Sequence, residues 1–266
     1  MFYKFKNILC HPSRIGMYIL DRFTSIIGYF FFFFVITTCF FAANDLSKTK
    51  FNGNTANAVV DVLLKVDTIK DTTFKDKKLT GTKEIIDTEG VRIYFNDSAH
   101  LNQDHGMKLI LVFSQSEANA YYSSIHLGKL IYAESEIQDF TFEEIHNKSI
   151  ANRLELETII QSLLNASDGN FRALYFWQDL LNMLLFYAVA LFLCYVVATI
   201  ANNTIEPKFR KKLVVYDSLI YFFGVWLSIL YDVSWLLYFG IFLACVYTVI
   251  TFSHIRAIPI KKGENV

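Results

Sequence analysis

Two histidines and two aspartates lie close together between Asp97 and His105, and they are the side chains best suited to hold a metal ion. Imidazole and carboxylate groups are both ligands of zinc, which makes His100, Asp104 and His105 the candidate ligands. Their spacing matches no standard zinc motif, and a hydrophilic loop between two strands explains the same residues. We therefore expect no bound metal and no other cofactor.

One further carboxylate, Asp87, lies in a turn-forming segment that runs to Gly90, and it has no evident partner for acid–base catalysis. The chain also contains no G-x-S-x-G nucleophile elbow, no P-loop and no dinucleotide-binding glycine fingerprint. The sequence therefore indicates a protein that is not an enzyme. A membrane-bound hydrolase that uses the His/Asp loop stays open as one alternative.

Four apolar segments must position these groups relative to a membrane. The chain has 266 residues and is 53% hydrophobic, and the apolar residues are concentrated in blocks. Residues 24–43 carry no charge over 20 positions, which is about 30 Å of helix and one hydrocarbon thickness. A second span is expected at 175–201. Residues 213–253 read as two spans joined only by residues 231–234, which forces an antiparallel helical hairpin.

The distribution of lysine and arginine predicts the orientation of these spans. Basic residues cluster before the first span, between the second and third, and after the fourth: Lys4, Lys6, Arg14, Arg22; Lys208, Arg210, Lys211, Lys212; Arg256, Lys261, Lys262. The positive-inside rule places residues 1–23, 202–212 and 254–266 in the cytoplasm. Residues 44–174 then lie outside. We expect a multi-pass protein of a bacterial cell membrane, because the outside segment has no cysteine for a disulfide.

The cytoplasmic N-terminal segment, residues 1–23, alternates apolar and basic residues. This pattern is typical of an amphipathic segment that lies on the inner leaflet. Pro12 and Ser13 are expected to begin the helix that becomes the first span.

The outside segment predicts an α+β domain, so the fold class is an α-helical membrane protein with an inserted extracytoplasmic α+β domain. A helix is expected at 54–66, and strands at 83–87, 91–96, 108–113, 120–126 and 129–133. Gly90 is expected to supply a positive φ in the first turn, and Leu127-Gly128 to form the second. Thr141 and Glu144 make a capping box. An amphipathic helix follows and is expected to end at residues 167–169.

Ionisable residues inside a span are the usual sign of a transport pathway. Asp179 and Asp232 fall at the expected outer boundary, and Asp217 falls one turn inside the cytoplasmic end. We expect Asp217 to be an interfacial anchor, or to pair with Lys211 or Lys212, rather than to relay protons. The expected membrane-interface residues are Trp177, Asp217 and Trp235. No span is short or broken by Gly or Pro, and no inverted repeat is visible, which disfavours a self-contained transporter.

Four short segments carry a family resemblance: His11-Pro12-Ser13, residues 71–79, residues 85–90 (Ile-Ile-Asp-Thr-Glu-Gly) and residues 210–217. They resemble a Firmicutes family of uncharacterised four-span membrane proteins, some of which are named maltodextrin-utilisation membrane proteins. Asp87, Thr88 and Gly90 form the family-like structural motif. Residues 70–74 lack the proline that the family usually carries there. The resemblance implies a cell-membrane location and a link to carbohydrate uptake, and it supplies no catalytic residues.

The leading functional hypothesis is a non-enzymatic accessory or sensor protein whose extracytoplasmic domain binds a partner or ligand. The expected partners are the lipid bilayer and another membrane protein, transporter subunits in particular. A net charge of zero argues against nucleic acid. A membrane-embedded transporter component is the second hypothesis, and the hydrolase is the third. Under the first, Asp87→Ala or a substitution of Gly90 should reduce the amount of folded protein.

Overall fold

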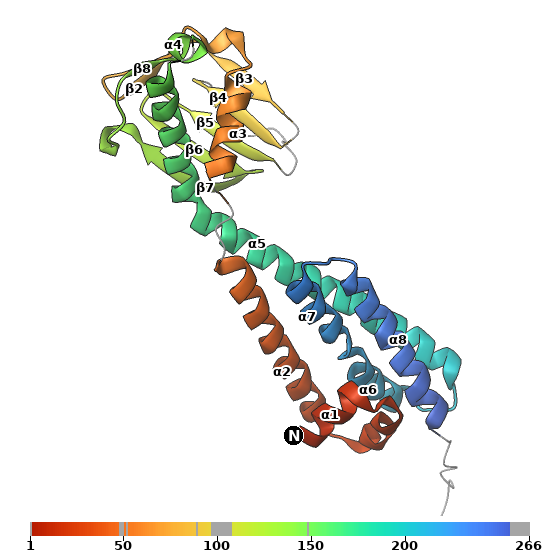
Figure 1. The fold of residues 1–266 in the computed structure, drawn as a ribbon. Coiled ribbons are helices and arrows are strands. Elements are labelled where there is room, and N and C mark those ends of the chain that lie inside the picture. Colours follow the sequence, from red (N-terminus) through yellow and green to blue (C-terminus); the bar gives the residue numbers. More distant parts are fainter. Residues whose placement is uncertain are drawn as a thin grey trace, which may run out of the picture. The chain divides into compact units, whose positions relative to one another are not determined.

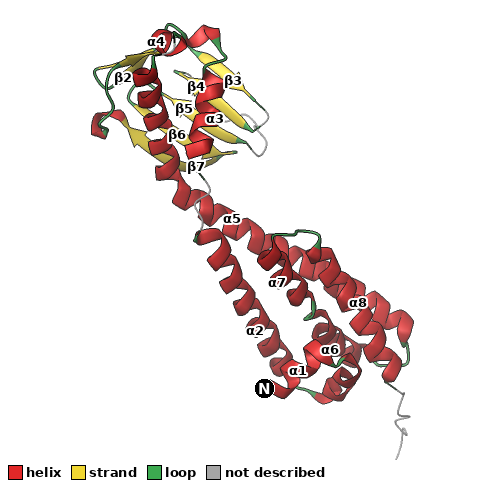
Figure 2. Cartoon of the chain, in the orientation of Figure 1, coloured by secondary structure: helices red, strands yellow, loops and turns green. Residues whose placement is uncertain are grey.

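The computed structural model describes residues 2–47, 51, 53–88, 90–96, 108–147 and 149–255 of the chain. It forms two compact units. The helical unit comprises Met1–Asp45 and Phe176–Val266, and the sheet unit comprises Leu46–Tyr175. Helices dominate the described chain, and all described strands lie between Thr73 and Thr141 (Figure 2).

The four predicted spans coincide with four helical stretches that are long and apolar enough to cross a membrane. These stretches are Phe23–Leu46, Ile150–Ala201, Pro207–Tyr231 and Leu236–His254. The chain therefore has the helices of a multi-pass membrane protein.

The helical unit begins with the short helices α1 and η1 and continues with the helices of the four apolar stretches (Figure 1). Its elements are α1 (Phe2–Cys10), the 3₁₀ helix η1 (Pro12–Leu20), α2 (Phe23–Phe41), the π-helical turn η2 (Ala42–Leu46), the C-terminal part of α5 (Ile150–Ala201), α6 (Pro207–Ser218), α7 (Tyr221–Tyr231) and α8 (Leu236–His254). The turn between α7 and α8 places Asp232 in the left-handed conformation, with φ of 54°. This confirms the predicted helical hairpin.

Aromatic side chains fill the interior of the helical unit. Phe33 on α2 stacks on Trp226 of α7, with ring centroids 5.6 Å apart and planes 9° apart. The Trp226 indole donates a hydrogen bond of 2.7 Å to the Thr37 hydroxyl, so its one polar atom is satisfied. Outward-facing side chains such as Phe192 and Phe242 stay exposed, and this apolar exposure suits contact with lipid tails.

The N-terminal segment is part of this core rather than a separate surface helix. Asn7 and Ile8 on α1 and Ile15 on η1 are fully buried. The prediction that Pro12 begins the helix of the first span is wrong, because η1 is a separate nine-residue 3₁₀ helix. The backbone of Asp21 is not helical (ψ of 147°), and α2 begins only at Phe23.

The sheet unit contains a five-stranded mixed sheet in the order β3-β4-β5-β6-β7 and a small sheet in the order β2-β1-β8. Its elements are α3 (Gly53–Leu63), η3 (Asp67–Ile69), β1 (Thr73–Lys75), β2 (Lys78–Thr80), β3 (Glu84–Asp87), β4 (Val91–Phe95), β5 (Leu109–Phe113), β6 (Glu117–Tyr122), β7 (Ile125–Ile131), η4 (Tyr132–Glu134), β8 (Phe140–Thr141), α4 (Phe142–His146) and the N-terminal part of α5. Strands β4 and β5 are parallel, and the other neighbours in the large sheet are antiparallel.

Helices α3 and α5 lie side by side across one face of the large sheet (Figure 1). Their buried residues, such as Val60, Leu63 and Ile160, join the inward residues of the strands in one hydrophobic core. Tyr94, Ile110 and Val112 form a second, smaller buried cluster. The α+β character expected from the sequence is therefore present.

The predicted first hairpin is present, because β3 pairs with β4 in antiparallel register from Glu84↔Phe95 to Asp87↔Arg92. The expected role of Gly90 is wrong. Gly81 is the one glycine with positive φ among the described residues, and a methyl group built on Gly90 would meet nothing within 4 Å. The Thr88 side chain organises the turn, since its hydroxyl donates to the Val91 carbonyl over 2.7 Å.

The second hairpin is present, but its predicted turn is wrong. The chain reverses at Ser123, which adopts φ of 56°, and Leu127 and Gly128 lie inside β7. Leu127 is fully buried in the core. A Cβ on Gly128 would lie 2.7 Å from the Ser167 hydroxyl oxygen, so this glycine permits the close approach of α5 to the sheet.

The capping box is confirmed at its first residue, because the Thr141 hydroxyl accepts a hydrogen bond of 3.2 Å from the Glu144 amide. The helix that it caps, α4, ends at His146, and α5 begins at Ile150.

Helix α5 then continues for 52 residues, so the predicted end at residues 167–169 is wrong. Ser167 donates to the Leu163 carbonyl one turn earlier, over 2.7 Å. Asp168 forms an ion pair of 2.9 Å with Arg172 one turn later. Both side chains therefore bond along the helix instead of capping it, and packing on the sheet overrides the weak helix propensity of the Ser-Asp-Gly sequence.

Candidate functional site

The His/Asp loop with His100, Asp104 and His105 lies outside the described residues. Within the described part of the chain, no group of three or more His, Cys, Asp or Glu side chains is placed to hold a metal ion. His126 serves in packing and hydrogen bonding: its Nε2 lies 3.2 Å from the Asn119 side-chain oxygen, and its ring packs edge-on against Tyr121.

Asp87 is the centre of an ion cluster that joins three strands. Its carboxylate pairs with Arg92 of β4 and, at 2.8 Å, with Lys108 just before β5. Hydrogen bonds from Arg92 and then from Lys108 lower the pKa of Asp87 to about 2. A carboxylate that is ionised and doubly paired at neutral pH has no proton to donate and little basicity. The cluster therefore holds the hairpin to β5 and offers no general acid or base.

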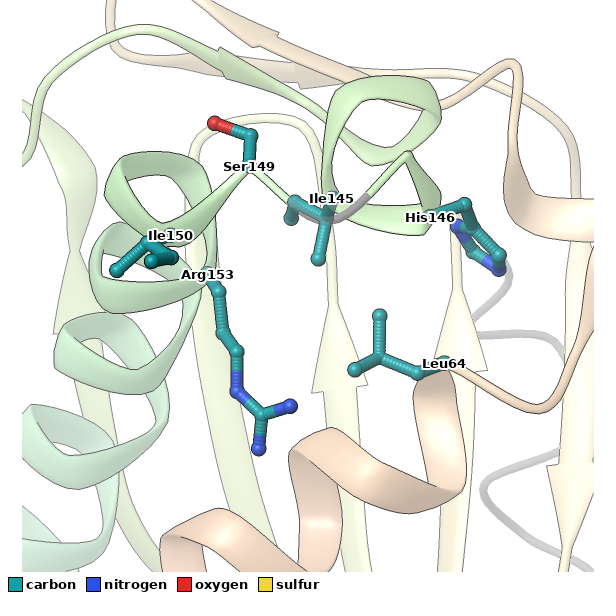
Figure 3. Close-up of a pocket in the computed structure, with 6 residues that line it drawn as sticks. All are labelled: Leu64, Ile145, His146, Ser149, Ile150 and Arg153. Atoms are coloured by element: carbon teal, nitrogen blue, oxygen red, sulfur yellow. The ribbon is translucent and has the colours of Figure 1, made fainter.

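One pocket of the sheet unit lies where α3, α4 and α5 approach one another (Figure 3). It measures about 280 Å³ and is lined by Leu64, Ile145, His146, Ser149, Ile150 and Arg153. Arg153 is already paired with Asp61 and Glu157, each at 2.9 Å. The Ser149 side chain points away from the His146 imidazole (Figure 3). These two side chains therefore form no nucleophile–base pair, and the pocket gives the hydrolase hypothesis no support.

Asp217 on α6 is the most unusual ionisable residue that the structure describes. Its side chain is fully buried, and its Oδ1 lies 2.6 Å from the Thr251 hydroxyl of α8. Its Oδ2 has no hydrogen-bond partner among the described residues. The structure does not pair Asp217 with Lys211 or Lys212, and its expected place at the membrane interface stays a prediction. Asp217 lies in the packed interior, because α6 turns this face towards α8 and η1.

The third span is interrupted just after Asp217, which the sequence did not indicate. Helix α6 ends at Ser218 and α7 begins at Tyr221. Across the break, Leu219 and Ile220 bond to the carbonyls of Tyr216 and Asp217, three residues earlier, over 3.3 and 3.4 Å. Such a 3₁₀ turn within a helix is a frequent mark of a hinge. Neither Gly nor Pro causes it, so no breaker residue could have revealed it.

Hydroxyl groups line the interior around this break. Tyr187 of α5 and Ser218 lie 3.1 Å apart, and Tyr221 donates to the Met183 carbonyl over 3.2 Å. All four residues lie on α5 or at the break itself. In the sequence, Tyr187 and Tyr221 look like ordinary aromatic residues of a span, but they place hydroxyl groups in the interior. Their hydrogen bonds satisfy polar groups that lipid tails could not satisfy.

A pocket of about 230 Å³ lies between α2, α5, α7 and α8 at the end that carries the α7–α8 turn. It is lined by Phe41, Asn44, Asp179, Asn182, Met183, Phe186, Val225, Ser228, Ile229, Asp232, Ser234 and Leu237. The structure thus brings together Asp179 and Asp232, the two boundary aspartates. Trp177 and Trp235, the two tryptophans expected at the membrane interface, are 64% and 62% exposed.

Comparisons with known proteins give no relative. No family model matches the chain, no curated protein matches it, and no solved structure matches it. The resemblance carried by His11-Pro12-Ser13 and residues 85–90 therefore stays a proposal.

Proposed function

We propose that this protein is a non-enzymatic membrane sensor or accessory protein, in which α5 transmits the state of the sheet unit to the helical unit. The observation that carries the proposal is the continuity of α5 over Ile150–Ala201.

Helix α5 contributes to both hydrophobic cores. Leu156, Ile159, Ile160, Leu163 and Leu164 belong to the core of the sheet unit. Met183, Tyr187, Ala190, Cys194 and Ala198 belong to the core of the helical unit. The same helix thus presents side chains to both cores, and this is the route that we propose for the transmission.

The basic clusters favour a sheet unit outside the membrane, and the resemblance favours an association with a carbohydrate-uptake transporter in a bacterial cell membrane. The exposed apolar side chains of the bundle, such as Phe31, Leu185 and Phe242, suit contact with lipid or with another membrane protein.

The accessory role is tested by a pull-down of the tagged full chain from its native membrane in mild detergent, followed by mass spectrometry. We expect transporter subunits in stoichiometric amounts. Recovery of the protein alone would contradict the accessory role.

The transmission through α5 is tested with Gln178→Pro, which removes a helix hydrogen bond, and with Gln178→Ala as the matched control. Hydrogen exchange of the full chain is measured with and without a mixture of malto-oligosaccharides. We expect both units to respond in the wild type and in Gln178→Ala, but the sheet unit alone to respond in Gln178→Pro. Equal transmission in Gln178→Pro would show that α5 is not the route, and no response of the wild type would exclude this class of ligand.

A transporter component is the second candidate function, and the interrupted third span favours it. Broken helices with buried ionisable groups are typical of transport sites. Asp217 beside the break at Leu219-Ile220 has both features. Proton or substrate uptake by the purified protein in vesicles would distinguish this function from the sensor.

A further inference from the structure

One hydroxyl group connects the buried acid to the N-terminal segment. The Thr251 oxygen lies 2.6 Å from Asp217 Oδ1 and 3.0 Å from the carbonyl oxygen of Pro12. Both distances are those of O–H···O hydrogen bonds. Thr251 is fully buried, so water does not reach this group.

The number of protons shared by Asp217, Thr251 and the Pro12 carbonyl limits which hydrogen bonds these groups can make at the same time. A hydroxyl has one proton and therefore makes one full hydrogen bond as a donor. The Pro12 carbonyl can only accept, so its contact with Thr251 is a hydrogen bond only when Thr251 donates to it. The contact between Thr251 and Asp217 is then a hydrogen bond only if the carboxyl group carries a proton and donates it. The geometry thus fits a neutral Asp217.

The surroundings of Asp217 agree with this assignment. Neither basic side chain of α6 with a defined contact reaches it: Arg210 donates to the Thr199 hydroxyl and to the Ile205 carbonyl, and Lys212 donates to the Asp21 carbonyl. A buried carboxylate without a cation partner is strongly unfavourable, so such a group holds a proton instead.

The same core holds other titratable groups that a pH experiment must consider. They are Cys194 and Tyr187 on α5, Cys245 and Tyr247 on α8, Tyr18 on η1, Tyr29 on α2, Tyr216 beside Asp217, and the ion pair of Lys4 with Asp21 at 2.7 Å. His11 precedes Pro12 in the chain and is the nearest histidine in sequence. It therefore has to be tested separately in any pH experiment.

We propose that Asp217 is a proton-binding site of the helical unit, and that its bound proton holds the N-terminal segment on α8 through Thr251 and Pro12. When the proton leaves, the carboxylate accepts a hydrogen bond from the Thr251 hydroxyl, and the Pro12 carbonyl loses its hydrogen bond from Thr251. The 3₁₀ turn at Leu219-Ile220 gives α6 a hinge at which Asp217 can move towards water. This proposal does not depend on the sensor function.

The test uses the full chain in lipid nanodiscs and two measurements across a pH series. Infrared difference spectroscopy detects the C=O stretch of a protonated carboxyl group, and hydrogen exchange reports the protection of Pro12–Leu20. We expect the carboxyl band in the wild type at neutral pH and its loss at alkaline pH. Exchange of Pro12–Leu20 should rise with that loss on the order of tenfold, the factor for one buried hydrogen bond.

Asp217→Asn keeps a donor that cannot be lost, so we expect no band and a protection of Pro12–Leu20 that does not depend on pH. Asp232→Asn alters an exposed aspartate of the α7–α8 turn and is the matched control; it should titrate like the wild type. His11→Asn should leave the midpoint unchanged. Thr251→Val removes the hydroxyl that connects Asp217 to Pro12. In this variant, hydrogen exchange of Pro12–Leu20 should be fast at every pH.

The proposal is overturned if the wild type shows no carboxyl band, or if Asp217→Asn still shows the pH-dependent exchange. A midpoint that moves in His11→Asn would assign the titration to the histidine instead. If Asp217→Asn does not accumulate, the test rests on the carboxyl band of the wild type and on Thr251→Val. The proposal is contradicted if the exchange protection of Pro12–Leu20 in Thr251→Val changes with pH as it does in the wild type.

Discussion

Gly224 on α7 and Gly240 on α8 approach so closely that a Cβ on Gly224 would lie 2.5 Å from the Gly240 Cα. Small residues at such a crossing let two helix backbones come into contact in a membrane. A backbone atom cannot move aside as the end of a side chain can. The pair therefore sets the distance between the two helices of the closing hairpin.

We predict that Gly224→Ala destabilises the helical unit by about 1–3 kcal/mol, the range for overpacking a close contact. The measurement is thermal unfolding of the full chain in detergent. Gly28→Ala on α2 is the matched control, because a Cβ there meets nothing within 4 Å. An equal loss in both variants would mean that glycine flexibility, and not the crossing with Gly240, is what matters.

We predict that Gly128→Ala destabilises the sheet unit by about 1–3 kcal/mol. Its Cβ would lie 2.7 Å from the Ser167 hydroxyl oxygen and 2.9 Å from the Ala166 carbonyl oxygen, which is backbone of α5. Hydrogen exchange of β6 and β7 in the full chain measures the effect. Gly169 lies on α5, and a Cβ there would meet nothing within 4 Å. Gly169→Ala should instead slow the exchange of α5, since alanine favours a helix over glycine by up to about 1 kcal/mol.

The Asp87 cluster predicts a weak dependence of stability on acid. The folded-state pKa of Asp87 is about 2, below the usual 3.8 of an aspartate, because hydrogen bonds from Arg92 and Lys108 favour the carboxylate. The stabilisation is therefore fully present above pH 3.8 and is lost as the pH falls towards 2. The side chain is 39% exposed, so solvent screening limits the effect to less than about 1 kcal/mol.

Asp87→Asn checks this prediction. The variant should unfold at a lower temperature than the wild type at pH 6, and the difference should shrink below pH 3. A difference that stays constant with pH would show that the charge of Asp87 is irrelevant.

Substitutions of Gly90 should have little effect, contrary to the sequence-based expectation, because its φ is not positive and its surroundings are open.

Tyr216→Phe should loosen the junction between η1 and α2. The Tyr216 hydroxyl donates to the Asp21 carboxylate over 2.5 Å, a charge-assisted hydrogen bond worth about 1.5–3 kcal/mol. We expect faster hydrogen exchange of Pro12–Leu20 in this variant. Tyr3→Phe is the control, because the Tyr3 hydroxyl meets Arg14 in an exposed contact of 3.3 Å and should contribute little. Equal exchange in the two variants would contradict the prediction.

The sequence by itself determined the spans and most of the strands. Residues 24–43 hold 20 uncharged positions, and a stretch of that length and composition has few alternatives to a membrane-length helix. Alternation and turn residues likewise located β3, β4 and β5, because the side-chain period of a strand is a local property.

Only the tertiary structure decided the features on which the proposals rest. Ser167-Asp168-Gly169 ends a helix by local propensity, yet packing against Gly128 and the ion pair with Arg172 continue α5 through it. Asp217 reads as a boundary residue in the sequence, and its burial depends on Thr251 and Pro12, which are far away in the chain. Contacts at long sequence separation leave no local periodic signal, and for that reason these features were not predictable from the residues alone.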